Sequence, residues 1–139
     1  MTVVLTGIRA ADKGALLAEL ARRAATILGA DAGTLARLLA AREALGSTGT
    51  GGGIAVPHAR LPGLADPASF FARLDRPVPF DAIDARPVDL VFLLVSPPGD
   101  HARHLAILAA ASRRLRDPAT VAALRGAATP AEIAALLAA

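Results

Sequence analysis

Apolar residues recur at helical spacing in the first third of the chain. The spacing predicts an amphipathic helix from Asp12 to Leu28, with Gly29 as its stop. Its inward-facing positions are Leu16, Leu20, Ala24 and Ile27. A second helix is predicted from about Ala32 to Leu45, with Gly46 as its C-terminal cap. Its inward-facing positions are Leu35, Leu38, Leu39 and Leu45.

The middle of the chain has the β-rich composition of strands. Residues 88–95 are almost continuously apolar, which predicts a central strand covered on both faces. Shorter strands are predicted at 54–56, where Pro57 ends the strand, and at 69–74. Residues 47–53 are four glycines and three hydroxyl-bearing residues, so we predict a loop there.

Three capped helices are predicted in the last third. Asp100 can cap a helix whose inward positions are Leu105, Leu108, Ala109, Ser112 and Leu115. Asp117 and Pro118 open a shorter helix that ends at Gly126, and a capping box from Thr129 to Glu132 opens one to about Ala138. Helices first, strands in the middle and helices last predict an α/β fold, with helices packed on a sheet.

Composition narrows the class of protein. The length of 139 residues fits a single domain over 1–139. The hydrophobic fraction is 54%, but much of it is alanine, and no stretch approaches the roughly 20 strongly apolar residues of a membrane span. The first residues lack the pattern of a secretory signal, and the chain contains no cysteine. We therefore expect a cytoplasmic protein without membrane insertion.

The charge pattern gives no nucleic-acid signature. The formal net charge is only +3, and the longest basic clusters are the pairs Arg22-Arg23 and Arg113-Arg114. Four phenylalanines, with no tyrosine or tryptophan, are a poor platform for stacking bases. We expect no nucleic-acid partner.

Three histidines are the candidates for chemistry. His58 follows the predicted strand end and is preceded by Pro57, at a place where α/β folds bind ligands. His104 lies in the first turn of the helix after the central strand, and a first-turn side chain leans toward the helix N-terminus. His104 is thus expected to project into the same crevice as His58, whereas His101 is expected to face solvent.

The surroundings of His58 fit a phosphoryl-accepting histidine. Such a ring needs one nitrogen with a free lone pair, while the other donates its proton to a fixed acceptor. The phosphoryl oxygens need donors, and positioning and electrostatics dominate the transfer. The candidate donors are the Arg42 guanidinium, the hydroxyls of Ser47 and Thr48, the backbone N–H groups of Gly51 to Gly53, the helix N-terminus near Asp100, and His104.

The sequence disfavours two other types of site. A metal site built from the three histidines lacks a neighbouring glutamate, and Asp100 is better placed as a helix cap. A nucleotide-binding loop would need a Gly-Lys-Ser/Thr ending and a preceding strand, whereas this glycine-rich run follows a helix. We expect neither a metal nor a cofactor.

Two stretches together resemble a known family. The first is Arg42-Glu-Ala-Leu-Gly-Ser-Thr-Gly-Thr-Gly-Gly-Gly-Ile-Ala-Val-Pro-His58, and the second is His104-Leu-Ala-Ile-Leu108. They resemble the phosphorylation-site motif and the second histidine element of the fructose/mannitol-type enzyme IIA domains of the bacterial phosphoenolpyruvate-dependent phosphotransferase system. The stretch from Pro77 to Leu90 is most similar to the nitrogen-regulatory branch, and the similarity covers essentially the whole chain.

The resemblance implies a fold and a phosphotransferase role. The family fold is a mixed β-sheet with helices on both faces. His58 would accept a phosphoryl group from a histidine-containing phosphocarrier protein, and His104 and Arg42 would orient and stabilise it. Regulated targets in this branch include potassium-transport and sensor-kinase proteins. Two alternatives stay open: a sugar-specific IIA protein that passes phosphate to a separate IIB protein, and a binding module of the same fold without phosphotransfer.

Overall fold

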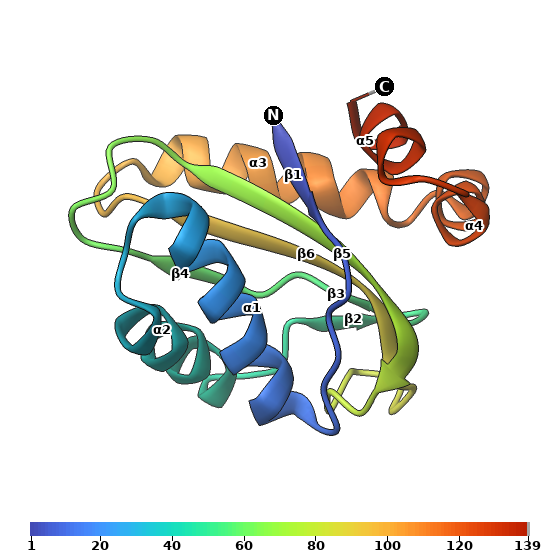
Figure 1. The fold of residues 1–139 in the computed structure, drawn as a ribbon, viewed down its shortest axis with the longest axis horizontal. Coiled ribbons are helices and arrows are strands. Elements are labelled where there is room, and N and C mark those ends of the chain that lie inside the picture. The colour runs from blue at the N-terminus through green and yellow to red at the C-terminus, as the bar shows by residue number, and fades with distance from the viewer. Residues whose placement is uncertain (139) are drawn as a thin grey trace.

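The computed structural model describes residues 1–138, which form five helices around a six-stranded sheet (Figure 1). The strands are β1 (Thr2–Leu5), β2 (Gly49–Gly51), β3 (Ile54–Ala55), β4 (His58–Arg60), β5 (Ala68–Val78) and β6 (Val88–Ser96). The helices are α1 (Lys13–Leu28), α2 (Ala32–Ala44), α3 (His101–Arg114), α4 (Pro118–Gly126) and α5 (Pro130–Ala138). The α/β class with a mixed sheet is confirmed.

The sheet is built around β6. Its strand order is β1-β5-β6-β3-β2, with β5 antiparallel to β6 and parallel to β1. Strands β3 and β4 pair in parallel with the same edge of β6, one after the other: Ile54 is opposite Leu90 and His58 is opposite Leu94. Pro57 lies between the two short strands, where its missing N–H interrupts the ladder.

Helices cover both faces of this sheet (Figure 1), as predicted. One apolar cluster joins α1 and α2 to one face, and a second joins α3, α4 and α5 to the other. Successive residues of β6 alternate between the two clusters, Val91, Leu93 and Val95 in the first and Leu90, Phe92 and Leu94 in the second. The prediction of a central strand buried on both faces is therefore confirmed.

The predicted loop at 47–53 is wrong in its middle. Gly49–Gly51 forms β2, which pairs antiparallel with β3. The hairpin turn needs Gly52 and Gly53, whose φ angles of 66° and 83° favour glycine. Strand β1 was not predicted, although its run Thr-Val-Val-Leu has the β-branched residues typical of strands.

The helix ends agree closely with the caps expected, but some side-chain directions do not. Asp100 and Asp117 accept hydrogen bonds from backbone N–H groups as N-caps, and Gly29 ends α1 with a φ of 66°. The residue that caps α2 is Leu45 rather than Gly46. Four side chains that were predicted to face inward are instead exposed: Ile27, Leu45, Leu105 and Ala109. In α3 the buried stripe contains His104 and Ala111, so the helix is rotated from the predicted phase.

Candidate functional site

His58 lies at the first position of β4, on the edge strand between the two helical layers. In a strand, alternate residues point to the same face, so His58 and Arg60 share one face while Ala59 packs into the cluster under α1 and α2. Their face is the one that α3 covers, since Leu94, opposite His58, belongs to the cluster on that side. The half-buried imidazole can be reached from both layers because β4 has no further strand beside it in this region.

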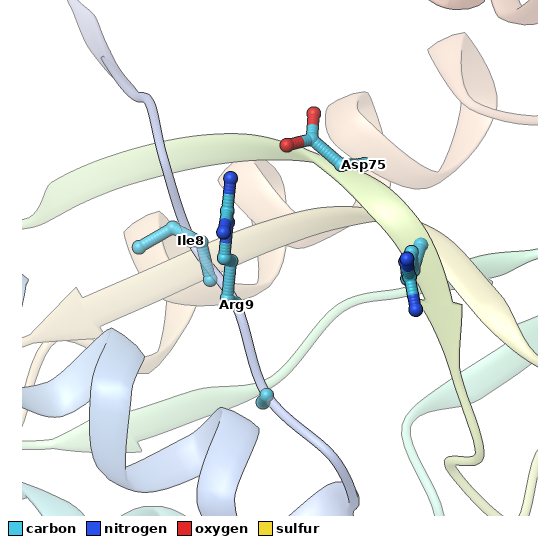
Figure 2. A pocket seen from close by; sticks show the side chains of 5 residues that line it. Ile8, Arg9 and Asp75 are labelled. Carbon is cyan, nitrogen blue, oxygen red and sulfur yellow. The ribbon is translucent and has the colours of Figure 1, made fainter.

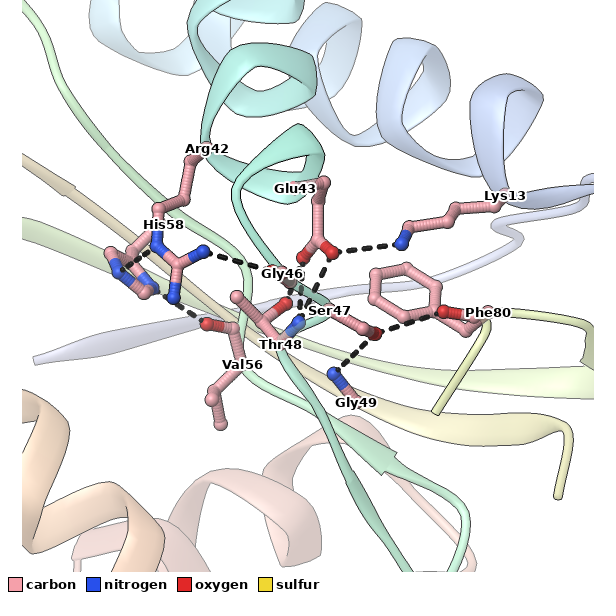
Figure 3. A network of polar contacts seen from close by, with 10 residues as sticks. All are labelled: Lys13, Arg42, Glu43, Gly46, Ser47, Thr48, Gly49, Val56, His58 and Phe80. Atoms are coloured by element: carbon pink, nitrogen blue, oxygen red, sulfur yellow. Dashed lines mark hydrogen bonds and ion pairs between the residues drawn. The ribbon is translucent and has the colours of Figure 1, made fainter. Parts of the chain in front are cut away.

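Hydrogen bonds fix the tautomer of His58 (Figure 3). Its Nδ1 lies 2.9 Å from the carbonyl oxygen of Val56, which can only accept, so Nδ1 carries the proton. The lone pair of Nε2 then accepts from Nε of Arg42 at 3.1 Å. Burial lowers the pKa of His58, partly offset by the bond to Val56, and the nearby Arg42 lowers it further. The ring is held neutral with its lone pair on Nε2.

Arg42 reaches His58 from the last turn of α2. Its Nη1 donates to the carbonyl oxygen of Gly46 at 2.9 Å, just past the helix end. This second bond ties the guanidinium to the helix C-terminus, where a cation is also favoured by the helix dipole. The structure thus brings Arg42 and His58 together, sixteen residues apart in sequence.

His104 faces His58 from the first turn of α3. The ring centroids are 5.4 Å apart at an interplanar angle of 63°. His104 is only 4% exposed, and its Nδ1 lies 2.7 Å from Oγ of Ser96. Burial lowers the pKa of His104 to about 4, with further lowering by the positive charge of Arg60. Two neutral imidazoles therefore share one edge of the sheet.

The buried His104 should make folding stability depend on pH. Between pH 6.5 and pH 5 the unfolded chain binds a proton at this residue that the folded chain excludes, so the free energy of unfolding falls as the pH falls. We expect this residue to contribute about 2 kcal/mol of that fall. Urea unfolding at both pH values measures it. His104→Asn should lose less stability on acidification than the wild type, whereas His101→Asn, at an exposed position, should match the wild type; equal losses in all three proteins would contradict the assignment.

Ser47 and Thr48 lie in a separate polar network rather than at His58 (Figure 3). Oγ of Ser47 donates to the carbonyl oxygen of Phe80 at 3.0 Å and accepts from the Gly49 N–H at 3.0 Å. The Thr48 hydroxyl bonds the carboxylate of Glu43, which also accepts from the Thr48 N–H. Both hydroxyls predicted as phosphate donors therefore hold the backbone that leads into β2.

Glu43 is the centre of this network and was not among the predicted site residues. Its side chain is 4% exposed and pairs with Nζ of Lys13 at 2.9 Å, while the same ammonium lies 4.7 Å from the centroid of Phe80. The spacing Leu35, Leu39, Glu43 places the carboxylate on the buried stripe of α2. In the sequence, a glutamate at the spacing of the buried leucines was the signal that could have indicated a buried ion pair. The network fixes the end of α2 next to Arg42.

Breaking the Glu43 network should destabilise the fold. In Glu43→Gln, the buried position keeps its size but loses the charge that pairs with Lys13 and one of the two oxygens that accept from the Thr48 N–H. We expect the free energy of unfolding to fall by about 2 kcal/mol, measured by urea denaturation. Glu19→Gln on α1, whose pair with Arg22 is exposed, should cost less than about 1 kcal/mol. A loss at Glu43 no larger than that at Glu19 would show that the network is not stabilising.

The structure does not bring Gly51 and Gly53 to His58. The carbonyl oxygen of Gly53 accepts from the Asp89 and Leu90 N–H groups at the start of β6, whereas His58 is opposite Leu94. Four residues of strand separate the two levels, which is roughly 13 Å. The glycines predicted to donate to phosphate instead belong to the hairpin of β2 and β3, away from His58.

One hollow of the surface lies away from the histidine pair. A hollow of about 420 Å³ is lined by Ile8, Arg9, Ala10, Asp75 and Arg76 (Figure 2). It lies beyond Arg73 of β5, which is opposite Leu90, and so at the other end of β6 from His58. Within residues 1–138, no three His, Asp or Glu side chains are grouped so that they could hold a metal ion. None of the helices described there is long and apolar enough to cross a membrane.

Comparisons with known proteins agree on one group of relatives. A family model described as phosphoenolpyruvate-dependent sugar phosphotransferase system, EIIA 2 matches residues 1–139. A nitrogen regulatory protein of Bradyrhizobium diazoefficiens is 45% identical over 114 residues, which are 82% of this chain and 74% of the relative. A protein of the same name from Pseudomonas aeruginosa is 53% identical over 78 residues, which are 56% of this chain and 51% of the relative.

A solved structure supports the same grouping. The crystal structure of nitrogen regulatory protein IIA-Ntr from Neisseria meningitidis superposes with a TM-score of 0.88 at 29% identity. The match covers 98% of this chain and 91% of the Neisseria chain. The arrangement of sheet and helices described above is therefore shared with that protein over nearly its full length.

Proposed function

The chain belongs to the EIIA 2 family of the phosphoenolpyruvate-dependent sugar phosphotransferase system, and from this membership we propose that it is a regulatory phosphoryl carrier of the nitrogen-type branch. In this proposal His58 accepts a phosphoryl group from a histidine-containing phosphocarrier protein and later releases it. The phosphorylation state then controls contacts with partner proteins, with potassium-transport and sensor-kinase proteins as the target classes. The observation that supports it most is the neutral His58 ring with its Nε2 lone pair beside Arg42.

The proposed transfer uses Nε2 of His58 as the nucleophile. Its lone pair forms a bond to phosphorus while the phosphorus–nitrogen bond of the donor phosphohistidine breaks, and that electron pair returns to the donor ring. Nδ1–H keeps its bond to the Val56 carbonyl, which stabilises the positive charge that the His58 ring gains. Because Nε of Arg42 occupies the Nε2 lone pair in this structure, the guanidinium must turn from the nitrogen to the phosphoryl oxygens as the group arrives.

His104 is proposed to donate to the phosphoryl group. Its pKa of about 4 keeps the ring neutral, so one ring nitrogen is a donor and the other an acceptor. We assign the Ser96 hydroxyl as the donor to Nδ1 of His104, which places the His104 proton on Nε2. From a ring centroid 5.4 Å from that of His58, an Nε2–H group can reach an oxygen of the transferred group. A neutral donor stabilises the product without holding it irreversibly.

The test is reconstitution of the donor chain. The purified protein is incubated with radiolabelled phosphoenolpyruvate, enzyme I and the histidine-containing phosphocarrier protein. We expect a label that is labile in acid and stable in alkali, as a phosphohistidine is, and that depends on the phosphocarrier. Failure of the wild-type protein to take up label would refute the proposal. Onward transfer of the label to a separate IIB protein would support the sugar-specific alternative over the regulatory one.

A further inference from the structure

Arg60 lies beside the histidine pair and has a buried donor without a partner. It follows His58 by two residues in β4, so both side chains lie on the α3 side of the sheet. Its Nη2 lies 3.0 Å from Nδ1 of His101, at the start of α3. Among the side chains of residues 1–138, Nη1 of Arg60 is the one buried nitrogen or oxygen that has no hydrogen-bond partner. An unpaired buried donor costs about 1–3 kcal/mol, so its retention calls for an explanation.

The charge of Arg60 acts on both histidines. After burial, which has the largest effect, Arg60 is the next cause that lowers the pKa of His104. It also adds to the lowering at His58, behind burial and Arg42. A cation that influences both rings lies close to where a phosphoryl group on His58 would sit. Asp66, the nearest acid in sequence, pairs instead with Arg103.

We propose that Arg60 is a second anion-binding residue of this site, whose Nη1 donates to an oxygen of the phosphoryl group on His58. Arg42 approaches the group from α2, and Arg60 approaches it from β4 itself on the α3 side, so the two guanidinium groups would hold it across the edge of β4. The pairing of Nη2 with His101 keeps Arg60 oriented without neutralising its charge. The inference rests on the proposed function, because it assigns a role in holding the same phosphoryl group.

Chemical phosphorylation tests Arg60 without any partner protein. Potassium phosphoramidate can transfer its phosphoryl group to a histidine ring nitrogen with release of ammonia, and ³¹P NMR follows the product. We expect Arg60→Gln to form phospho-His58 about tenfold more slowly than the wild type, with Arg60→Lys between them, because a charge-assisted hydrogen bond is lost and then partly restored. The matched control is Arg103→Gln, which removes one positive charge from exposed α3 and should behave as the wild type.

The outcomes separate this inference from the proposed function. A wild type that takes label from neither phosphoramidate nor the phosphocarrier overturns both. A labelled wild type with an equally fast Arg60→Gln overturns only the role of Arg60. A variant that is slow with the phosphocarrier but normal with phosphoramidate also overturns it, because Arg60 would then contact the donor protein.

A second measurement covers the case in which Arg60→Gln does not fold. In ¹⁵N-labelled wild type, the guanidinium N–H signals of Arg60 are recorded before and after phosphorylation by phosphoramidate. We expect a signal of Arg60 to move downfield on phosphorylation, because Nη1 gains an anionic acceptor, while the signals of Arg103 stay in place. An Arg60 signal that does not move would overturn the proposal.

Discussion

His58→Gln should take up no phosphoryl label from the phosphocarrier, while its fold should stay intact. Glutamine can keep a polar contact at this half-buried position, but its amide nitrogen has no lone pair for attack on phosphorus. The expected loss is complete within detection, because the arrangement of Arg42 and His104 around an absent nucleophile cannot transfer the group. Scintillation counting of the isolated protein and circular dichroism of the fold are the two measurements.

The matched control is His101→Gln, since His101 is an exposed histidine near the same site. It should still take up the label, because His101 only orients Arg60 in our account. Persistent acid-labile label in His58→Gln, or its disappearance in His101→Gln, would move the acceptor away from His58.

The pH dependence of this labelling follows from the same geometry. Because burial lowers the pKa of His58, Nε2 keeps its lone pair at pH values where a solvated histidine is already protonated. We expect uptake of label to stay constant as the pH falls through 6.5 and to decline only at lower pH, with the initial rate of phosphoramidate labelling as the measurement. A rate that already halves at pH 6.5 would show that the ring is not protected from protonation.

The histidine pair could be predicted from sequence because each ring follows a strong local signal. Pro57 lies between β3 and His58, and the cap at Asp100 fixes the start of α3, so His104 lies in its first turn. Which side chains of α3 face the core was harder to predict. Leu105 looked like a core position by its apolarity, yet the buried stripe contains His104, because the Ser96 hydroxyl satisfies its ring. A paired polar side chain can occupy a position that hydrophobicity assigns to a leucine.

The phosphate donors expected in the glycine-rich run show where sequence reasoning stops. Ser47 and Thr48 are close to His58 along the chain, but the turn after α2 directs their hydroxyls to Phe80 and Glu43. Gly51 and Gly53 form the far end of a hairpin because β2 doubles back on β3 before the chain reaches His58. Arg60 was not predicted as a site residue, because residues distant in the sequence bring it to the site. Its relevance depends on α3 lying over β4, a long-range contact that no local pattern contains.

Arg42 is the residue whose loss should slow transfer most while the nucleophile is still present. Arg42→Gln removes a guanidinium that the proposal places on the phosphoryl oxygens, and we expect transfer from the phosphocarrier to slow on the order of 10²- to 10³-fold. Arg42→Lys should recover only part of the rate, because an ammonium lacks the planar fork of the guanidinium. Single-turnover labelling measures both variants, with Arg37→Gln, at an exposed position on α2, as the control at the wild-type rate.

NMR titration supplies a second readout: Arg42 lowers the pKa of His58, so that pKa should rise in Arg42→Gln. A raised pKa of His58 with an unchanged transfer rate would mean that Arg42 sets the protonation of the ring but does not bind the phosphoryl group.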